Sequence, residues 1–153
     1  MVQPPFYTDG LRFSCTRCSS CCRYESGYVF LSQKDLDILS AALDMVQENF
    51  IKTWCRWVWL GGGTEYLSLK EKLNYDCVFW KDGCTVYQSR PLQCRTFPFW
   101  ESILVSAAAW EGASRECPGV GHGELYTMAR IEEQLRTRVS QPPITRKPER
   151  PGV

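Results

Sequence analysis

CTRCSSCC, residues 15–22, places four of the chain's nine cysteines within eight consecutive positions. A cysteine that only fills a core is usually isolated on a buried face. In contrast, C-x2-C-x2-C spacing brings several sulfurs around one point when a loop folds over it. Zinc and iron are both bound by thiolates in this way. The segment therefore indicates a metal site built from cysteines.

A second, wider group of cysteines follows downstream, and its last member precedes Pro118 and Gly119. The two groups supply eight candidate thiolates, enough for two four-ligand sites or for one cluster with thiols to spare. They are Cys15, Cys18, Cys21, Cys22, Cys77, Cys84, Cys94 and Cys117. The ninth, Cys55, lies in the aromatic run WCRWVWL, residues 54–60. We predict that Cys55 is a buried thiol outside the site.

Disulfide bonds are the alternative use of nine cysteines in 153 residues. The first residues, MVQPPFYTDGLRFSC, have no basic segment followed by an apolar run, so no signal peptide is predicted. The sequence contains no run of eighteen apolar residues, so no membrane-spanning helix is predicted. We therefore expect a cytoplasmic protein, whose reducing surroundings keep thiols available for metal. Disulfide geometry also disfavours a bond between the adjacent Cys21 and Cys22.

The composition, with 44% hydrophobic residues, predicts a core that does not depend on metal alone for its stability. The charges nearly cancel, with 18 basic and 17 acidic residues, so no strongly charged partner is implied. No basic patch with interleaved aromatic residues indicates nucleic-acid binding, and no P-loop, dinucleotide fingerprint or HExxH motif is present. The only histidine, His122, lies in the turn GVGHG and is a poor basis for catalysis.

The predicted fold class is α+β, a small single domain with a few helices, a short β-hairpin and cysteine-rich loops. We expect the metal-binding domain to cover residues 1–140. Residues 141–153, QPPITRKPERPGV, are proline-rich and basic without apolar periodicity, which predicts a disordered tail.

Local patterns place the expected elements around the cysteines. Ser32 and Asp35 resemble a capping box before an amphipathic helix that runs to about residue 46. A second helix is predicted over residues 47–59, ended by three glycines, and a last one over 122–139. Residues 102–112 are ambiguous between strand and helix.

Short strands are predicted at 66–69, 77–80 and 84–87. The last two form a hairpin about Lys81, Asp82 and Gly83, with Cys77 and Cys84 at its outer ends. Ser89 and Pro91 then open a short helical turn that delivers Cys94 nearby.

The order of these motifs resembles the YkgJ-like cysteine-cluster family of zinc- or iron-chelating domains. The resemblance rests on C-x2-C-x2-C-C at 15–22, Cys77, Cys84, the segment RPLQCRTFPFW at 90–100, and CPG at 117–119. It implies a metal-chelating domain that uses the eight cysteines. Flagellin lysine methylases have a similar cysteine cluster but are longer chains, which leaves an enzymatic role open.

The form of the metal stays open between an iron–sulfur cluster and zinc. The triple C-x2-C-x2-C with a distant Cys-Pro resembles ferredoxin-type ligation and leads us to favour an iron–sulfur cluster, with Cys117 as the closing ligand. Paired cysteines around a hairpin are common in zinc sites. Arg17, Arg23, Arg90 and Arg95 lie within a few residues of ligands, where a cation favours the thiolate. Arg90 and Arg95 also belong to the family-like segment, so we predict that they support the bound metal or cofactor.

Three function classes remain open: a metal-binding protein, an iron–sulfur oxidoreductase or methyltransferase-like enzyme, and a zinc-stabilised interaction module. The sequence names no protein partner.

Overall fold

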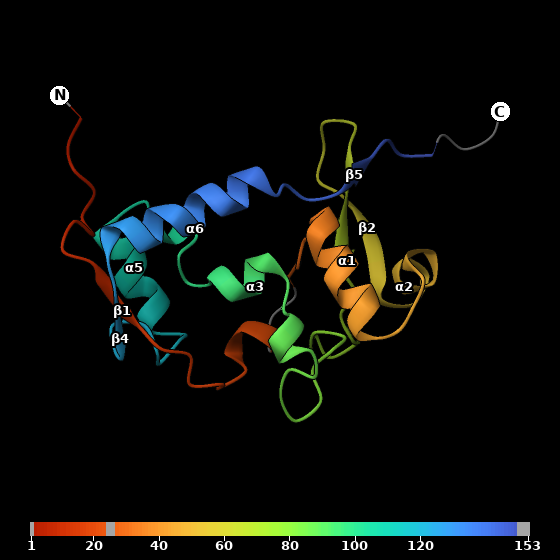
Figure 1. The fold of residues 1–153 in the computed structure, drawn as a ribbon, viewed down its shortest axis with the longest axis horizontal. Helices are drawn as coiled ribbons and strands as arrows, with labels where there is room; N and C mark the ends of the chain where they lie inside the picture. The colour runs from red at the N-terminus through yellow and green to blue at the C-terminus, as the bar shows by residue number, and fades with distance from the viewer. Residues whose placement is uncertain (1, 24–26, 150–153) are drawn as a thin grey trace. The chain divides into compact units, whose positions relative to one another are not determined.

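The computed structural model describes residues 2–23 and 27–149 (Figure 1). Helix α1 (Gln33–Ala42) begins where the capping box predicts. The Ser32 hydroxyl accepts a hydrogen bond from the Asp35 amide at 3.1 Å, and the Asp35 carboxylate accepts one from the Ser32 amide at 2.9 Å. These bonds satisfy two amides that the helix itself leaves without acceptors. Leu36 and Leu39 are buried on the inner face of the helix.

The chain divides into two compact units, and the first comprises residues 1–21 and 96–140. In this unit β1 (Leu11–Phe13) pairs antiparallel with β4 (Glu124–Tyr126). Helices α4 (Glu101–Leu104), α5 (Ala107–Ser114) and α6 (Met128–Ser140) complete it. The unit has its own core of buried residues: Tyr7, Phe13, Phe99, Leu104, Trp110, Val120 and Ile131.

The second unit comprises residues 22–95 and 141–153. Its three-stranded antiparallel sheet has the order β2 (Cys55–Trp59), β3 (Glu65–Leu69), β5 (Thr145–Arg146), and α1 lies beside it (Figure 1). Helix α2 (Gln47–Trp54), the 3-10 turn η2 (Tyr87–Ser89) and α3 (Leu92–Thr96) follow in chain order, with β2 and β3 between α2 and η2. A separate core contains Leu31, Leu36, Leu39, Phe50, Cys55, Leu67, Leu69, Phe79 and Val86. The α+β class is confirmed.

The helix predicted over residues 47–59 was too long. Helix α2 ends at Trp54, and the next five residues form β2. The aromatic and β-branched run CRWVW suits a strand, and it pairs with β3 in the register Trp57↔Leu67. Gly61, Gly62 and Gly63, with φ of 94°, 71° and 73°, make the turn between the two strands instead of ending a helix.

The hairpin predicted over residues 77–87 is reduced to two isolated bridges, Glu71↔Cys77 and Trp80↔Cys84. Its turn is confirmed, because the Lys81 amide donates to the Gly83 carbonyl at 2.8 Å. The short turn sets Cys84 opposite Trp80, so Cys77 and Cys84 do not face each other as the outer ends of a regular hairpin. The strand predicted at 66–69 is present as β3, and the short helical turn before Cys94 is present as η2 and α3.

The last helix also begins later than predicted. Residues 124–126 pair with β1, and α6 starts at Met128. Residues 102–112, which the sequence left ambiguous, contribute to α4 and α5. None of the helices in the described part of the chain is long and apolar enough to cross a membrane.

The structure differs from the predicted disordered tail over part of residues 141–153. Ile144 packs against the core of the second unit, its amide donates to the Leu31 carbonyl at 2.8 Å, and its carbonyl accepts from the Leu67 amide at 2.9 Å. Strand β5 then pairs with β3. The apolar side chain of Ile144 and the free edge of β3 together hold this segment against the second unit. Residues 150–153 of the predicted tail lie outside the described residues.

Candidate metal centre

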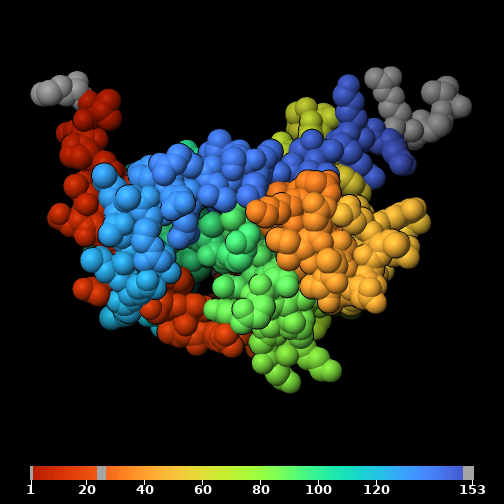
Figure 2. Space-filling model, viewed as in Figure 1, coloured from red at the N-terminus to blue at the C-terminus, as the bar shows by residue number. Residues whose placement is uncertain are grey.

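The first cysteine loop, residues 14–19, leaves β1 and leads into the 3-10 turn η1 (Ser20–Cys22). Figure 2 shows this red-orange part of the chain at the molecular surface, and Cys15, Cys18 and Cys21 are exposed. Between them, Arg17 and Ser19 adopt left-handed backbone conformations, with φ of 56° and 70°. Such conformations cost about 1–3 kcal/mol each for residues other than glycine and are concentrated at ligand-binding loops.

These left-handed turns direct backbone amides toward sulfur. The Arg17 amide donates to the Cys15 Sγ at 3.4 Å. The side chain and then the backbone of Ser20 hydrogen-bond the Cys18 thiol and lower its pKa below the ordinary value. Successive amides around a turn form a concave site that stabilises anions, thiolates and cluster sulfides among them. The loop is therefore suited to hold the Cys18 sulfur as a thiolate.

The Cys117 loop is fastened to the residues just before Cys15. The Ser14 amide donates to the Gly119 carbonyl at 3.3 Å, the Gly121 amide donates to the Arg12 carbonyl at 2.9 Å, and Phe13 and Val120 form a bridge. At Gly119 a Cβ atom would overlap the Ser14 carbonyl oxygen. Glycine is required there because the two backbones approach so closely.

The Cys117 thiol is close enough to the first loop to sense its charges. Burial raises the pKa of Cys117, the amides of Gly119 and Val120 lower it by hydrogen bonding, and the thiols of Cys18 and Cys21 raise it electrostatically. The fold of the first unit thus places the turn that carries Cys117 beside the segment that carries Cys18 and Cys21. His122 is exposed on the same turn, and its amide donates to the Gly119 carbonyl at 3.3 Å.

In the second unit, Cys22 and Cys77 are neighbours. The Cys77 amide donates to the Cys22 carbonyl at 2.7 Å. The next residue after Cys22 pairs with the residue before Cys77, because Arg23 Nε lies 2.9 Å from Asp76 Oδ1. The Arg23 guanidinium also stacks on Trp80, 3.7 Å from the ring centroid. This arrangement fixes the two cysteine-bearing segments side by side.

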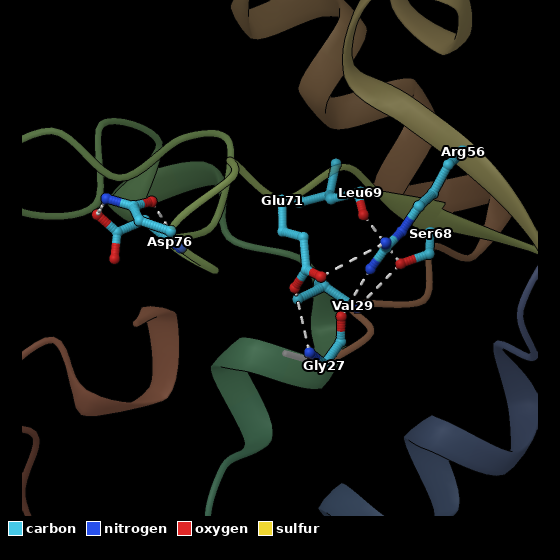
Figure 3. Close-up of polar contacts among 8 residues, drawn as sticks. Gly27, Val29, Arg56, Ser68, Leu69, Glu71 and Asp76 are labelled. Atoms are coloured by element: carbon cyan, nitrogen blue, oxygen red, sulfur yellow. Dashed lines mark hydrogen bonds and ion pairs between the residues drawn. The ribbon is translucent and has the colours of Figure 1, made fainter. Parts of the chain in front are cut away.

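A second polar network supports the same region (Figure 3). Arg56 donates to the Gly27 carbonyl at 2.8 Å and lies 3.7 Å from Glu71, whose carboxylate accepts from the Gly27 amide at 3.2 Å. The backbones of Glu71 and Cys77 form an isolated antiparallel β-bridge, and the Ser68 hydroxyl accepts a hydrogen bond from the Val29 amide at 3.1 Å. The network ties the chain after Cys22 to the strand that leads to Cys77.

Cys84 and Cys94 are half-buried in the same unit. Cys84, like Cys77, packs against the core of this unit, and Cys94 is carried by α3. The buried carboxylate of Asp35 accepts from the Leu92 amide at 2.9 Å in addition to the Ser32 amide, so it links the start of α3 to the start of α1.

The two arginines of the family-like segment shape the loop before Cys94. Arg90 Nε donates to the Tyr87 carbonyl at 3.0 Å, and its guanidinium stacks on the Tyr87 ring at 3.9 Å. Arg95 Nε donates to the Arg90 carbonyl at 2.9 Å. Both side chains therefore hold backbone carbonyls of the turn that presents Cys94.

Sequence reasoning missed the residues that position the cysteines. Asp76 and Ser14 are each directly before a cysteine, and Asp35 lies far from any of them. The opposite charges directly beside Cys22 and Cys77 were a signal that these segments meet. No comparable signal marked Asp35, because a capping residue accounts for it fully at the sequence level.

The donor set fits a thiophilic metal. The structure contains no disulfide bond among the nine cysteines, all of which lie within its described residues. Among residues 2–23 and 27–149, no three cysteine, histidine, aspartate or glutamate side chains are clustered tightly enough to hold one metal ion, so binding requires the thiols to turn toward one another. The indole Nε1 of Trp80, between Cys77 and Cys84 in the chain, is buried without an acceptor among these residues.

Cys55 is more deeply buried than the eight clustered cysteines. It is 5% exposed, lies on β2 and belongs to the core of the second unit. Burial raises its pKa to about 12, with Lys70 opposing the shift. A thiol that resists ionisation in this way is a poor metal ligand.

Comparison with known proteins places the sequence of this chain in a family. No solved structure matches the chain. Residues 14–118 match the family model CxxCxxCC, described as a putative zinc- or iron-chelating domain. The matched region begins at the residue before Cys15 and ends directly after Cys117, so it contains all eight cysteines of the two groups. The chain belongs to the CxxCxxCC family of zinc- or iron-chelating domains.

Proposed function

We propose that this chain binds metal through the thiolates of its eight clustered cysteines, with iron held as an iron–sulfur cluster. The observation that carries the proposal is the juxtaposition, in the first unit, of a C-x2-C-x2-C loop with the distant Cys117. The ladder between residues 12–14 and 119–121 supports it. Three ligands from one compact loop and a fourth from a remote Cys-Pro is a ferredoxin-like arrangement.

Hydrogen bonds to sulfur support the cluster over a bare ion. Amides of Arg17, Gly119 and Val120 point at Cys15 and Cys117. Such bonds offset the negative charge of a thiolate-bound cluster and tune its reduction potential. The bound cluster would supply electron transfer or a Lewis-acid centre, while the chain's own residues hold the sulfurs, limit access of water at Cys117 and keep the loop in its left-handed turns.

Arg90 and Arg95 have a supporting role in this proposal. By holding the Tyr87 and Arg90 carbonyls they fix the turn that presents Cys94. Their positive charges also lower the energy of nearby thiolates. Because ligation requires reduced thiols, we place the protein in a reducing compartment such as the cytoplasm.

Zinc is the second candidate, and the surroundings of Cys77 and Cys84 favour it. Both side chains are half-buried against the core of the second unit, next to a tight turn. Structural zinc sites have this character, since four thiolates close the coordination shell and fasten the fold. A chain that binds only zinc would serve as a metal-stabilised interaction module or in metal handling.

Metal and acid-labile sulfide content, with an absorption spectrum, tests the proposal on protein purified without oxygen and without a histidine tag. Iron with matching sulfide and broad visible absorption is expected. Stoichiometric zinc without sulfide would retain metal binding and overturn the iron–sulfur form. Absence of stoichiometric iron or zinc would overturn the proposed function itself.

A further inference from the structure

We propose that the eight cysteines form two separate four-thiolate sites, Cys15, Cys18, Cys21 and Cys117 in the first unit and Cys22, Cys77, Cys84 and Cys94 in the second. This inference rests on the proposed function and adds the division of the ligands. Its unusual consequence is that the adjacent residues Cys21 and Cys22 serve different metal centres. The boundary between the two compact units falls between these two residues.

The first set is assembled by backbone contacts that do not involve the second unit. Ser14, directly before Cys15, is bonded to Gly119, and Gly119 has no room for a side chain because of this contact. The Cys117 thiol accepts hydrogen bonds from the amides of Gly119 and Val120 in its own turn. The turn that carries a fourth cysteine is therefore held beside the three-cysteine loop, and four thiolates are what zinc or one cluster requires.

The second set is assembled by different contacts. Cys22 and Cys77 share a backbone hydrogen bond of 2.7 Å, and directly beside them Arg23 pairs with Asp76 and stacks its guanidinium on Trp80. The tight turn after Trp80 returns the chain at Cys84. Asp35 fixes the start of α3, from which Cys94 projects. Each of the four thiols thus belongs to a segment held in the second unit.

The local backbone explains how neighbouring cysteines are divided. Both lie in the 3-10 turn η1, in which consecutive side chains are rotated by about 120° around the axis. Cys21 and Cys22 therefore leave the turn in different directions. Two sites of four thiolates also use all eight ligands with none to spare, and four thiolates are what zinc or one cluster requires.

Matched serine substitutions test the division. Cys21→Ser and Cys22→Ser make the same chemical change at adjacent positions, and Cys117→Ser and Cys77→Ser each remove a ligand from one set. With metal and sulfide measured per chain after anaerobic purification, each single variant is expected to keep about half the wild-type loading. The pair Cys21→Ser/Cys117→Ser should lose no more than either alone, whereas Cys21→Ser/Cys22→Ser should lose nearly all metal.

Cys55→Ser is the matched control, and it should keep the full loading. Loss of all metal in Cys117→Ser and also in Cys77→Ser, with far-ultraviolet circular dichroism unchanged, would overturn the division in favour of one shared centre. Wild-type protein without metal would instead mean that the proposed function has failed, so the two failures are distinguishable.

A second measurement uses only the unaltered chain and does not depend on how the variants fold. Metal-free protein is titrated with Co²⁺ without oxygen, and the thiolate-to-cobalt charge-transfer absorption is followed. Two equivalents bound, each with the absorption of a tetrahedral four-thiolate site, are expected. Saturation at one equivalent would contradict the two-site division.

Discussion

At Gly119 the backbone of the first unit leaves no room for a side chain. A methyl group there would overlap the Ser14 carbonyl oxygen, so Gly119→Ala must push the Cys117 turn away from the Cys15 loop. We expect a loss of about 2 kcal/mol of unfolding free energy, as for other overpacked sites. About half of the bound metal should be lost as well. Urea unfolding and elemental analysis measure the two effects.

The control for this substitution lies in the same unit. Gly112 is in α5 and has open space around its Cα, so alanine fits there. Gly112→Ala should raise stability by roughly 0.5–1 kcal/mol because alanine is the better helix residue, and metal content should stay constant. Equal metal loading in the Gly119 and Gly112 variants would show that the Ser14–Gly119 contact does not position Cys117.

The raised pKa of Cys55 predicts how the stability of the protein changes at alkaline pH. Its pKa rises from an ordinary value of 9.0 to about 12 through burial. The folded state therefore keeps a proton that the unfolded chain releases, and this contribution to stability is lost progressively as the pH rises from about 9 toward 12. Cys55→Ala removes the group. Its stability deficit relative to wild type should shrink between pH 7 and about pH 10.5 in urea unfolding.

A deficit that stays constant with pH would mean that Cys55 ionises as freely in the folded protein as in the unfolded chain. Metal content of the same variant should equal that of wild type, because a buried thiol that resists ionisation is a poor metal ligand.

At the scale of single residues, the sequence identified the thiols but not the groups that orient them. C-x2-C-x2-C spacing is visible in one dimension because its function is local. The contacts of Ser14 with Gly119 and of Arg23 with Asp76 join residues far apart in the chain, and only the folded backbone reveals them. The sequence shows Gly119 as part of the motif CPG, but the requirement for glycine there comes from the close approach of the Ser14 backbone.

At the scale of elements, Asp35 connects two helices through one carboxylate. Its side chain is 2% exposed and accepts from the Ser32 and Leu92 amides. Asp35→Ala leaves two buried amides without acceptors, so we expect a loss of about 2–4 kcal/mol and a displaced α3. Thermal unfolding and the rate of Cys94 alkylation in metal-free protein, followed by peptide mass analysis, measure both.

Asp37 serves as the comparison on the same helix. Its carboxylate accepts from exposed glutamine side chains, so Asp37→Ala should cost less than about 1 kcal/mol and leave Cys94 alkylation unchanged. If the two variants behaved alike, Asp35 would act only as an ordinary helix cap.

Helices and turns were predicted correctly where a few adjacent residues specify them. The prediction failed where pairing with a distant strand determines the structure. The capping box at Ser32 and the turn at Lys81–Gly83 depend on a few adjacent residues and were predicted correctly. Residues 55–59 continue the apolar pattern of α2, but they form β2 because β3 is available to pair with them. The strand preference of aromatic and β-branched residues, together with the pairing partner, outweighs the apolar periodicity here. The segment around Ile144 likewise takes its structure from distant residues, because Ile144 packs against the core of the second unit and β5 pairs with β3.

At the scale of the whole molecule, each unit has its own apolar core, so metal fastens a fold that hydrophobic burial already favours. Removal of the metal with a strong chelator should therefore leave the far-ultraviolet circular dichroism of the helices largely intact. The melting temperature should fall, because a ligand that binds only the folded state stabilises it. Collapse of the helical signal on chelation would instead mean that the metal supplies the folding energy.

The cysteine loop should respond to the same treatment far more strongly than the helices. Arg17 is exposed between Cys15 and Cys18 in a segment without regular structure, and trypsin can reach it there. Ligation ties the loop at three points, so cleavage after Arg17 should be slow in the loaded protein and fast after chelation. Cys117→Ser should be cleaved quickly in either state, because the loop has lost its fourth ligand. Equal cleavage rates in loaded and metal-free wild-type protein would place the metal away from this loop and leave only the second unit to hold it.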